Sequence, residues 1–146
     1  MDISHEGAPT RLRAMPTRLV TQVALVANRA TDRALGATGS RRHHHALLAA
    51  LAEFGPISQA DLGRRTRIDR SDIVATVNEL AGRGFVERGP DHGDRRRKIV
   101  TITAAGTAHL AELDERLAVA QDELLAGLDA AERAELVRLL TRILDR

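Results

Sequence analysis

The sequence contains no cysteine, tryptophan or tyrosine among its 146 residues, and only two phenylalanines. The absence of cysteine excludes disulfides, thiolate metal sites, cysteine nucleophiles and thiol-based redox sensing. Because aromatic residues make up only 1% of the chain, we expect a core of Leu, Val, Ile and Ala, which favours packed helices over a β-sandwich or barrel. Binding of single-stranded nucleic acid by base stacking is disfavoured for the same reason, since it needs aromatic rings.

The chain also lacks a long apolar run. None approaches the roughly 20 residues of a transmembrane helix, and the polar N-terminus does not resemble a signal peptide. We therefore expect a soluble, cytoplasmic protein with no membrane partner. A hydrophobic content of 43% beside 29% charged residues indicates a globular chain, and the length fits one domain, or one domain with a dimerisation extension.

Charge is distributed unevenly along the chain. The formal net charge is only +2, but residues 55–103 carry 10 basic and 7 acidic side chains, whereas residues 104–146 carry 5 and 9. A basic middle joined to an acidic end is expected of a module that faces a polyanion, attached to a segment with another partner. Because 21 of the 22 cations are Arg, biased composition would also give many basic residues. The position of the cations is therefore more informative than their number.

Hydrophobic periodicity predicts a mainly helical chain. After a polar stretch that predicts a flexible arm, apolar residues at spacings of three and four predict helices over 16–35 and 41–54, with Ser40 as N-cap of the second. In the last third, regularly spaced leucines predict an amphipathic helix over 104–126, opened by Thr103. Asp129 and Glu132 have the spacing of a capping box and predict the start of a final helix.

The segment after Gly55 carries the most specific pattern. Ser58 stands three residues before Asp61, and Asp69 three residues before Asp72, and both have the spacing of a capping box. They predict two short helices joined by a tight turn, which is the helix-turn-helix arrangement. The two helices are expected over 59–66 and 70–83.

Two short strands are predicted next. The stretches "FVERG" and "RRRKIVTIT" flank the turn "PDHGD", and apolar and polar residues alternate in the second stretch with the period of a half-buried strand. If the second strand covers residues 95–103, alternation places Arg96 and Lys98 on one face of the sheet. Arg95 and Arg97 then lie on the other face. A helix-turn-helix followed by a two-stranded hairpin is a winged helix.

Two stretches carry a family resemblance. "ALAEFGPISQADLGRRTRIDRSDIVATVNELAGRGFVER" is similar to the winged-helix core of the MarR family of transcriptional regulators. "DHGDRRRKIVTITAAG" resembles the wing signature of that family: an acidic residue, Arg two positions later, an apolar strand, then Thr-x-x-Gly. The resemblance extends from about residue 16 to the end of the chain. It implies a winged helix-turn-helix with a two-stranded β-wing and long N- and C-terminal dimerisation helices.

The resemblance also implies how the chain is divided and used. A homodimer would intertwine its first helix and its last two helices and present two winged helices to a pseudo-palindromic operator in double-stranded DNA. The expected parts are a flexible arm (1–15), N-terminal helices (16–54), a winged-helix DNA-binding lobe (55–103) and C-terminal dimerisation helices (104–146).

In this resemblance the helix at 70–83 is the recognition helix, whose first turns enter the major groove. The side chains expected to be exposed there are Arg70, Ser71, Asp72, Ala75 and Thr76. Asp72 would either accept a hydrogen bond from a base or only cap the helix. Ser58 and Gln59 begin the preceding helix, where free N–H groups suit a phosphate. Arg64, Arg65 and Arg67 would add cationic contacts.

In the wing, Arg96 matches the arginine that enters the minor groove, and Asp94 matches the acid that braces it. A narrow A·T-rich minor groove concentrates negative potential and attracts a guanidinium. Arg95 and Arg97 would contact phosphates. For all these cations, a solvated surface role is the alternative.

The tract "HHH" at residues 43–45 invites a metal site, but three consecutive helical residues point about 100° apart and cannot close around one ion. We expect no metal and no cofactor. The resemblance implies an effector pocket between the dimer helices and the DNA-binding lobe, and a small phenolic anion would suit its lining. The candidate lining residues are Arg18, Gln22, His43, His44 and His45. For His45, packing is the expected role, and a pH or ligand switch at the tract is a hypothesis.

The expected function is that of a sequence-specific, double-stranded-DNA-binding transcriptional regulator, a repressor that acts as a homodimer and is released by a small molecule. Two alternatives stay open: a winged helix used for protein–protein docking, and a metal-responsive winged-helix regulator. An enzyme is not expected, because no Ser-His-Asp arrangement, phosphate loop or paired carboxylate is visible in the sequence.

Overall fold

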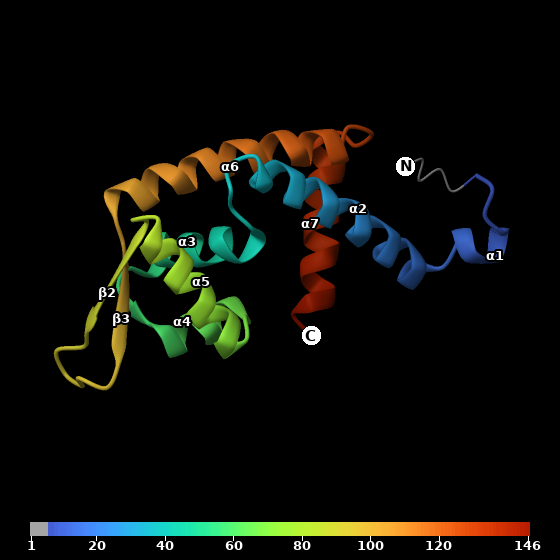
Figure 1. The fold of residues 1–146 in the computed structure, drawn as a ribbon. Helices are drawn as coiled ribbons and strands as arrows, with labels where there is room; N and C mark the ends of the chain where they lie inside the picture. The colour runs from blue at the N-terminus through green and yellow to red at the C-terminus, as the bar shows by residue number, and fades with distance from the viewer. Residues whose placement is uncertain (1–5) are drawn as a thin grey trace. The chain divides into compact units, whose positions relative to one another are not determined.

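The computed structural model describes residues 6–146 (Figure 1). The chain forms two compact units. The first, which we call the winged-helix unit, covers residues 32–118, and the second, the terminal unit, combines the start of the chain up to residue 31 with residues 119–146. The lobe predicted over 55–103 lies wholly within the winged-helix unit. None of the helices that the structure describes is both long and apolar enough to cross a membrane.

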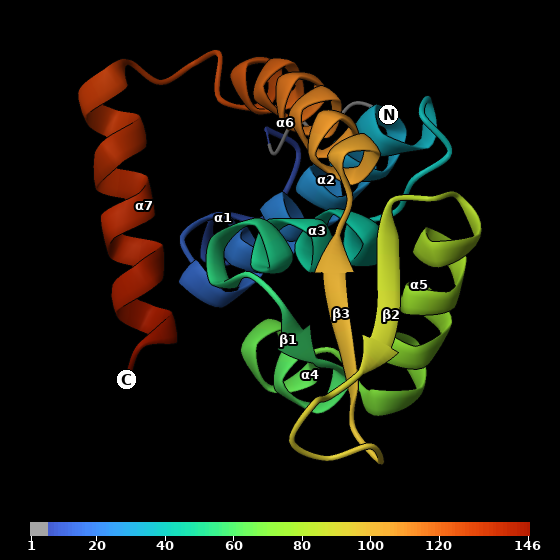
Figure 2. The ribbon, with the colours of Figure 1, turned by 90° about the vertical axis from the view of Figure 1, so that its left-hand side faces the viewer.

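The winged-helix unit contains a small antiparallel sheet with helices packed against it (Figure 2). Its elements are α3 (Arg42–Phe54), β1 (Ile57–Ser58), α4 (Gln59–Thr66), α5 (Arg70–Gly82), β2 (Val86–Pro90), β3 (Lys98–Ile102) and most of α6 (Ala104–Leu124). The strand order is β1-β3-β2, with Val86 opposite Ile102 and Pro90 opposite Lys98. The predicted mainly helical winged-helix fold is confirmed, and the two-residue strand β1 adds a third strand to the hairpin.

Aliphatic side chains form the core of this unit, as the scarcity of aromatic residues predicts. Leucines from α3, α4, α5 and α6 are fully buried together with Val100 of β3 and Val86 of β2. Burial of each such side chain contributes about 1.5–3 kcal/mol to folding. This core fixes α4 and α5 against the sheet and so determines where the surface of the helix-turn-helix lies.

Local hydrogen bonds explain where several helices begin. The Asp61 backbone N–H donates to Ser58 Oγ at 3.2 Å, so the predicted cap of α4 is confirmed. The Gly106 N–H donates to Thr103 Oγ1 at 3.0 Å, which confirms the predicted cap of α6. At the other end of α4, Arg67 has left-handed backbone angles (φ 56°, ψ 31°). A non-glycine residue there costs on the order of 1–2 kcal/mol, which the surrounding packing must offset.

Two predicted caps are wrong. Asp69 immediately precedes α5, but its side chain makes no capping hydrogen bond. The residue before α3 is Arg41 rather than Ser40. Ser40 is instead buried, and its hydroxyl is hydrogen-bonded to His109 Nε2 at 2.7 Å and accepts from Arg83 at 2.9 Å. The Ser40 hydroxyl is therefore committed to tertiary contacts and cannot cap a helix.

The second strand of the wing is shorter than predicted. It begins at Lys98, and the three residues before it form a turn. Asp94 holds this turn: its carboxylate accepts from the Arg96 N–H at 3.0 Å, and its carbonyl accepts from the Arg97 N–H at 3.0 Å. The predicted two-faced alternation of Arg95, Arg96 and Arg97 is wrong, because strand geometry does not extend to them.

The terminal unit contains α1 (Thr10–Arg13), most of α2 (Pro16–Gly36), the end of α6 and α7 (Ala130–Leu144). Asp129 and Glu132 form the predicted capping box of α7. Of the arm predicted over residues 1–15, residues 1–5 lie outside the described part of the chain, and α1 replaces the predicted irregular structure further along. None of the residues of α7 is buried, and its last two turns expose Leu139, Leu140, Ile143 and Leu144.

Candidate nucleic-acid interface

A concavity of about 750 Å³ lies between α4, α5 and the wing, the hairpin of β2 and β3 with its connecting turn. We call it the cationic groove. Figure 2 shows the wing extending past α4 and α5. Among the described residues that line the groove, none is Asp or Glu, and six are cationic: Arg64, Arg70, Arg88, Arg96, Arg97 and Lys98. A hollow lined by positive charges attracts a polyanion and raises the local concentration of that polyanion.

Two arginines tie the wing to the helices. Arg88 of β2 donates to Asn78 Oδ1 of α5. Arg97 donates to Ser58 Oγ at 3.1 Å and reaches Asp61 Oδ2 at 3.5 Å and Asp91 Oδ2 at 3.9 Å. These contacts set the separation between the wing and the helix-turn-helix. The predicted phosphate contact of Arg97 stays a prediction. A phosphate would have to compete with the partners that the Arg97 guanidinium has within the protein.

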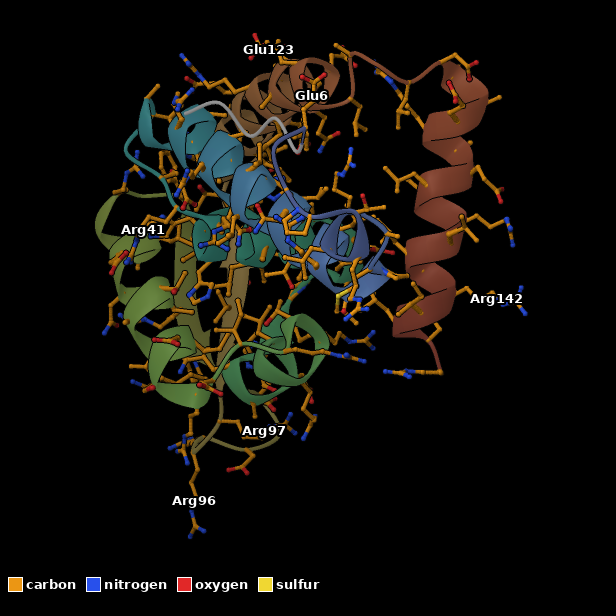
Figure 3. The ribbon with its side chains drawn as sticks, turned by 90° about the vertical axis from the view of Figure 1, so that its right-hand side faces the viewer. Glu6, Arg41, Arg96, Arg97, Glu123 and Arg142 are labelled. Atoms are coloured by element: carbon orange, nitrogen blue, oxygen red, sulfur yellow. The ribbon has the colours of Figure 1, made fainter. Side chains whose placement is uncertain are left out.

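Arg96 projects from the tip of the wing, and Figure 3 shows its side chain pointing away from the rest of the unit. Within residues 6–146 neither Arg95 nor Arg96 has an ion-pair partner. The prediction required Asp94 to brace the guanidinium of Arg96. Asp94 instead accepts a hydrogen bond from the Arg96 backbone N–H at 3.0 Å. The carboxylate therefore fixes the backbone from which the Arg96 side chain extends and leaves the guanidinium available.

The exposed face of α5 differs from the prediction at one position. Arg70, Ser71, Asp72 and Ala75 are exposed as predicted, but Thr76 is only 1% exposed and its hydroxyl donates to the Asp72 carbonyl at 2.6 Å. Its predicted exposure to DNA is wrong, because Thr76 lies on the same helical face as buried residues of the core. Its place beside the groove is taken by Val74, which is exposed and lines the groove.

The start of α4 is also more constrained than predicted. Ser58 is buried, and its hydroxyl serves as the cap of α4 and as the acceptor for Arg97. Gln59 lines the groove, and its Oε1 is a buried side-chain acceptor without a hydrogen-bond partner among the described residues. Arg65 does not line the groove: its guanidinium stacks over the ring of Phe54, 4.1 Å from the centroid. Arg65 thus faces a neighbouring hollow of about 470 Å³.

Sequence reasoning gave no role to Val74, Arg88 and Lys98 of the groove, and it offered Arg64 only as one of three possible cationic contacts. Strand alternation from buried Val86 would place Arg88 on the inward face, yet Arg88 is exposed because the wing extends beyond the core. No local signal in the sequence identifies it.

The histidine tract is divided among separate environments. His43 is exposed, whereas His44 is buried and accepts the Arg41 N–H at Nδ1, 2.9 Å away. Its Nε2 must therefore carry the proton and donate to Glu79 of α5, at 2.6 Å. His45 Nε2 lies 2.8 Å from Asp114 of α6.

Of the other predicted effector residues, Arg18 and Gln22 belong to the part of α2 in the terminal unit, whereas the histidines belong to the winged-helix unit. In the described part of the chain, no three His, Asp or Glu side chains gather in a way that could hold a metal ion.

His44 is expected to make folding stability depend on pH. Burial lowers the pKa of His44 below its ordinary value, and the hydrogen bond with Glu79 and its negative charge oppose the shift, while Arg41 and Arg83 add to it. Because the unfolded chain binds the proton more readily, the stability that neutral His44 contributes is present above about pH 6.5 and is lost as the pH falls below it. We expect wild type to lose more unfolding free energy between pH 7.5 and 5.5 than His44→Gln does.

The measurement is urea unfolding at fixed protein concentration across this range. The pKa of His109 is also lowered, mainly by burial, so a residual slope is expected in the variant. His43→Gln, which replaces an exposed neighbour, is the matched control and should keep the wild-type slope. Equal slopes for the two variants would contradict the assignment to His44.

Comparison with known proteins gives consistent matches. The sequence profile of the MarR family matches residues 38–97. The HTH-type transcriptional repressor NicR of Pseudomonas putida is 36% identical over 98 residues, 67% of this chain. The chain spans 62% and 60% of the length of the first two curated relatives that it matches.

Two solved structures are similar over nearly the whole chain. A probable transcriptional regulator from Pseudomonas aeruginosa has 31% identity and a TM-score of 0.81, with 91% of this chain and 99% of that chain covered. The PcaV transcriptional regulator of Streptomyces coelicolor, in complex with its natural ligand, has 27% identity and a TM-score of 0.80, with 94% of this chain and 97% of that chain covered.

Proposed function

The chain belongs to the MarR family of transcriptional regulators, and on that premise we propose that it is a homodimeric repressor that binds a pseudo-palindromic operator in double-stranded DNA. The observation that carries this proposal is the cationic groove, which combines six cations and a projecting wing beside the first turns of α5, with no acidic residue among its described lining. Family and structural relatives are regulators of transcription and not enzymes.

In the proposed complex, the first turns of α5 enter the major groove of DNA, and the wing reaches the adjacent minor groove. The sugar-phosphate backbone that separates the major from the minor groove of the DNA would lie over the cationic groove of the protein. Arg70 is placed to contact a base or a phosphate, while Val74 and Ala75 offer apolar contact to a thymine methyl group. The cations around them supply the sequence-independent part of the affinity.

Dimerisation is supported by the terminal unit. Its helix α7 has no buried residue, and it exposes Val137, Leu140, Ile143 and Leu144. Several large apolar side chains on one helix of a folded protein indicate a surface that is covered by a partner. A second copy of the chain would bring two recognition helices to half-sites about 34 Å apart.

Release by a small molecule is the remaining part of the proposal. PcaV was solved with its natural ligand, and a ligand that binds better to the DNA-free arrangement would shift the dimer away from the operator. The predicted effector residues Arg18, Gln22 and His43 stay candidates. His44 and His45 already have acidic partners, Glu79 and Asp114, so a ligand would have to compete with these.

The proposal is tested by DNA binding measured by fluorescence anisotropy as a function of salt, on a duplex selected from fragments of the source genome. We expect the logarithm of the affinity to fall linearly with that of the salt concentration, by about 0.9 per neutralised phosphate. Arg70→Ala should cost about 1–3 kcal/mol, roughly 5- to 150-fold in affinity. Arg116→Ala is the control, because Arg116 pairs with Glu112 on α6 and does not line the groove.

Two outcomes would favour the alternatives. If the protein changes the anisotropy of no duplex at any salt concentration, a protein–protein docking module would be favoured. A change in stability or DNA affinity on titration with zinc would favour a metal-responsive regulator.

A further inference from the structure

Asp61, in the first turn of α4, contacts two of the six cations of the cationic groove from outside it. Its carboxylate forms an ion pair with Arg64 and lies 3.5 Å from the guanidinium of Arg97. Asp61 does not line the groove but the neighbouring hollow, together with Phe54 and Arg65. Arg64 lines both. The acidic group is thus placed to attract groove cations without occupying the space that a phosphate would use.

The surroundings of Asp61 make this charge effective. Its side chain is only 34% exposed, so its field is less screened than that of a fully solvated carboxylate. Arg97 is held between Asp61 and the Ser58 hydroxyl, which is 3.1 Å away. Asp91 also approaches Arg97, at 3.9 Å. Among the described residues, Asp61 is the acid that contacts both Arg64 and Arg97.

We propose that Asp61 sets the affinity of the cationic groove for DNA by competing with phosphate for Arg64 and Arg97. This inference rests on the proposed function, since it assumes that the groove binds DNA. A phosphate that approaches the start of α4 must share these two guanidinium groups with the carboxylate and is repelled by its charge. The Asp61 carboxylate therefore weakens binding of the DNA phosphates, while the face of α5 that contacts the bases is unchanged.

The test is the DNA affinity of Asp61→Asn, measured as a salt titration on the selected duplex and on an unrelated duplex of equal length. The variant is nearly isosteric and removes only the charge. We expect affinity for both duplexes to rise about 3- to 10-fold, and the salt slope to steepen by about 0.9, the value for one more neutralised phosphate. The ratio between the two duplexes should stay within about twofold, because α5 supplies the base readout.

Two control variants isolate the effect of the local charge. Asp114→Asn makes the same change in net charge on α6, where the carboxylate contacts His45 and no groove cation, and it should leave the affinity within about twofold of wild type. Asp61→Glu keeps the charge and should resemble wild type. Thermal unfolding of each variant establishes that it is folded.

The outcomes separate this inference from the proposed function. If wild type binds with a salt slope but Asp61→Asn binds equally or more weakly, Asp61 only braces Arg97 and the wing, and the inference is overturned. Equal gains from Asp61→Asn and Asp114→Asn would overturn it as well, because net charge alone would then explain the effect. If wild type binds no duplex, the proposed function fails, and this inference fails with it.

Discussion

Replacing Arg96 with alanine is expected to weaken binding to an A·T-rich operator about 10- to 100-fold, whereas Lys98→Ala is expected to cost only about threefold. Both residues line the cationic groove, so a uniform cationic patch would make the two losses equal. The difference comes from the turn. Asp94 accepts from the backbone N–H groups of both Arg96 and Arg97, each at 3.0 Å. The backbone from which the Arg96 side chain extends is therefore fixed before DNA binds, so less conformational entropy is lost on binding.

The identity of the contacted groove can be checked with the same variant. Substituting the A·T pairs beneath the wing with G·C pairs widens the minor groove and places the guanine amino group in it. Wild type is expected to lose affinity on this duplex, and Arg96→Ala is expected to be insensitive to the change. Equal losses for Arg96→Ala and Lys98→Ala on both duplexes would mean that residues 95–98 act only as a generic cationic surface.

The parts of the fold that the sequence predicted are those that depend on neighbours along the chain. The caps formed by Ser58, Thr103 and Asp129 each involve a residue three positions later, so their spacing is visible in the sequence. Ser40 failed as a cap because its partner His109 is 69 residues away. Thr76 was misassigned although it follows buried Ile73 by three positions, because its polar side chain suggested exposure more strongly than its helical spacing suggested burial.

The candidate site shows the same limit. The cations of the wing were visible as a run, and the helices predicted over 59–66 and 70–83 located the second wall of the groove. Which cations face the groove depended on tertiary contacts. Arg64 and Arg65 are adjacent on α4, yet Arg65 stacks on Phe54 from α3 and leaves the groove to Arg64. Likewise, Arg88 joins the groove through its contact with Asn78 of α5, which no sequence spacing indicates.

Gly106→Ala is expected to destabilise the protein by about 3 kcal/mol or more, at the upper end of what an extra methyl group costs in a packed interior. A Cβ at position 106 would lie 2.0 Å from the Phe85 carbonyl oxygen and 2.9 Å from Ile102 Cγ1. The oxygen cannot easily turn away, because it accepts the Thr103 N–H at 3.0 Å. The first turn of α6 would have to separate from the start of β2, where the Thr103 hydroxyl also donates to the Gly84 carbonyl at 2.7 Å.

Gly82→Ala provides the matched control, because it adds the same methyl group where no atom of the described residues lies within 4 Å. Gly82 is the last residue of α5 and does not have a positive φ, so alanine should be neutral or stabilise by up to about 1 kcal/mol. Both variants are compared by urea unfolding at one protein concentration. A Gly106→Ala protein as stable as Gly82→Ala would show that α6 can shift away from β2 at little cost. In that case the Thr-x-x-Gly pattern of this chain would reflect the Thr103 cap alone and not the close contact between helix and strand.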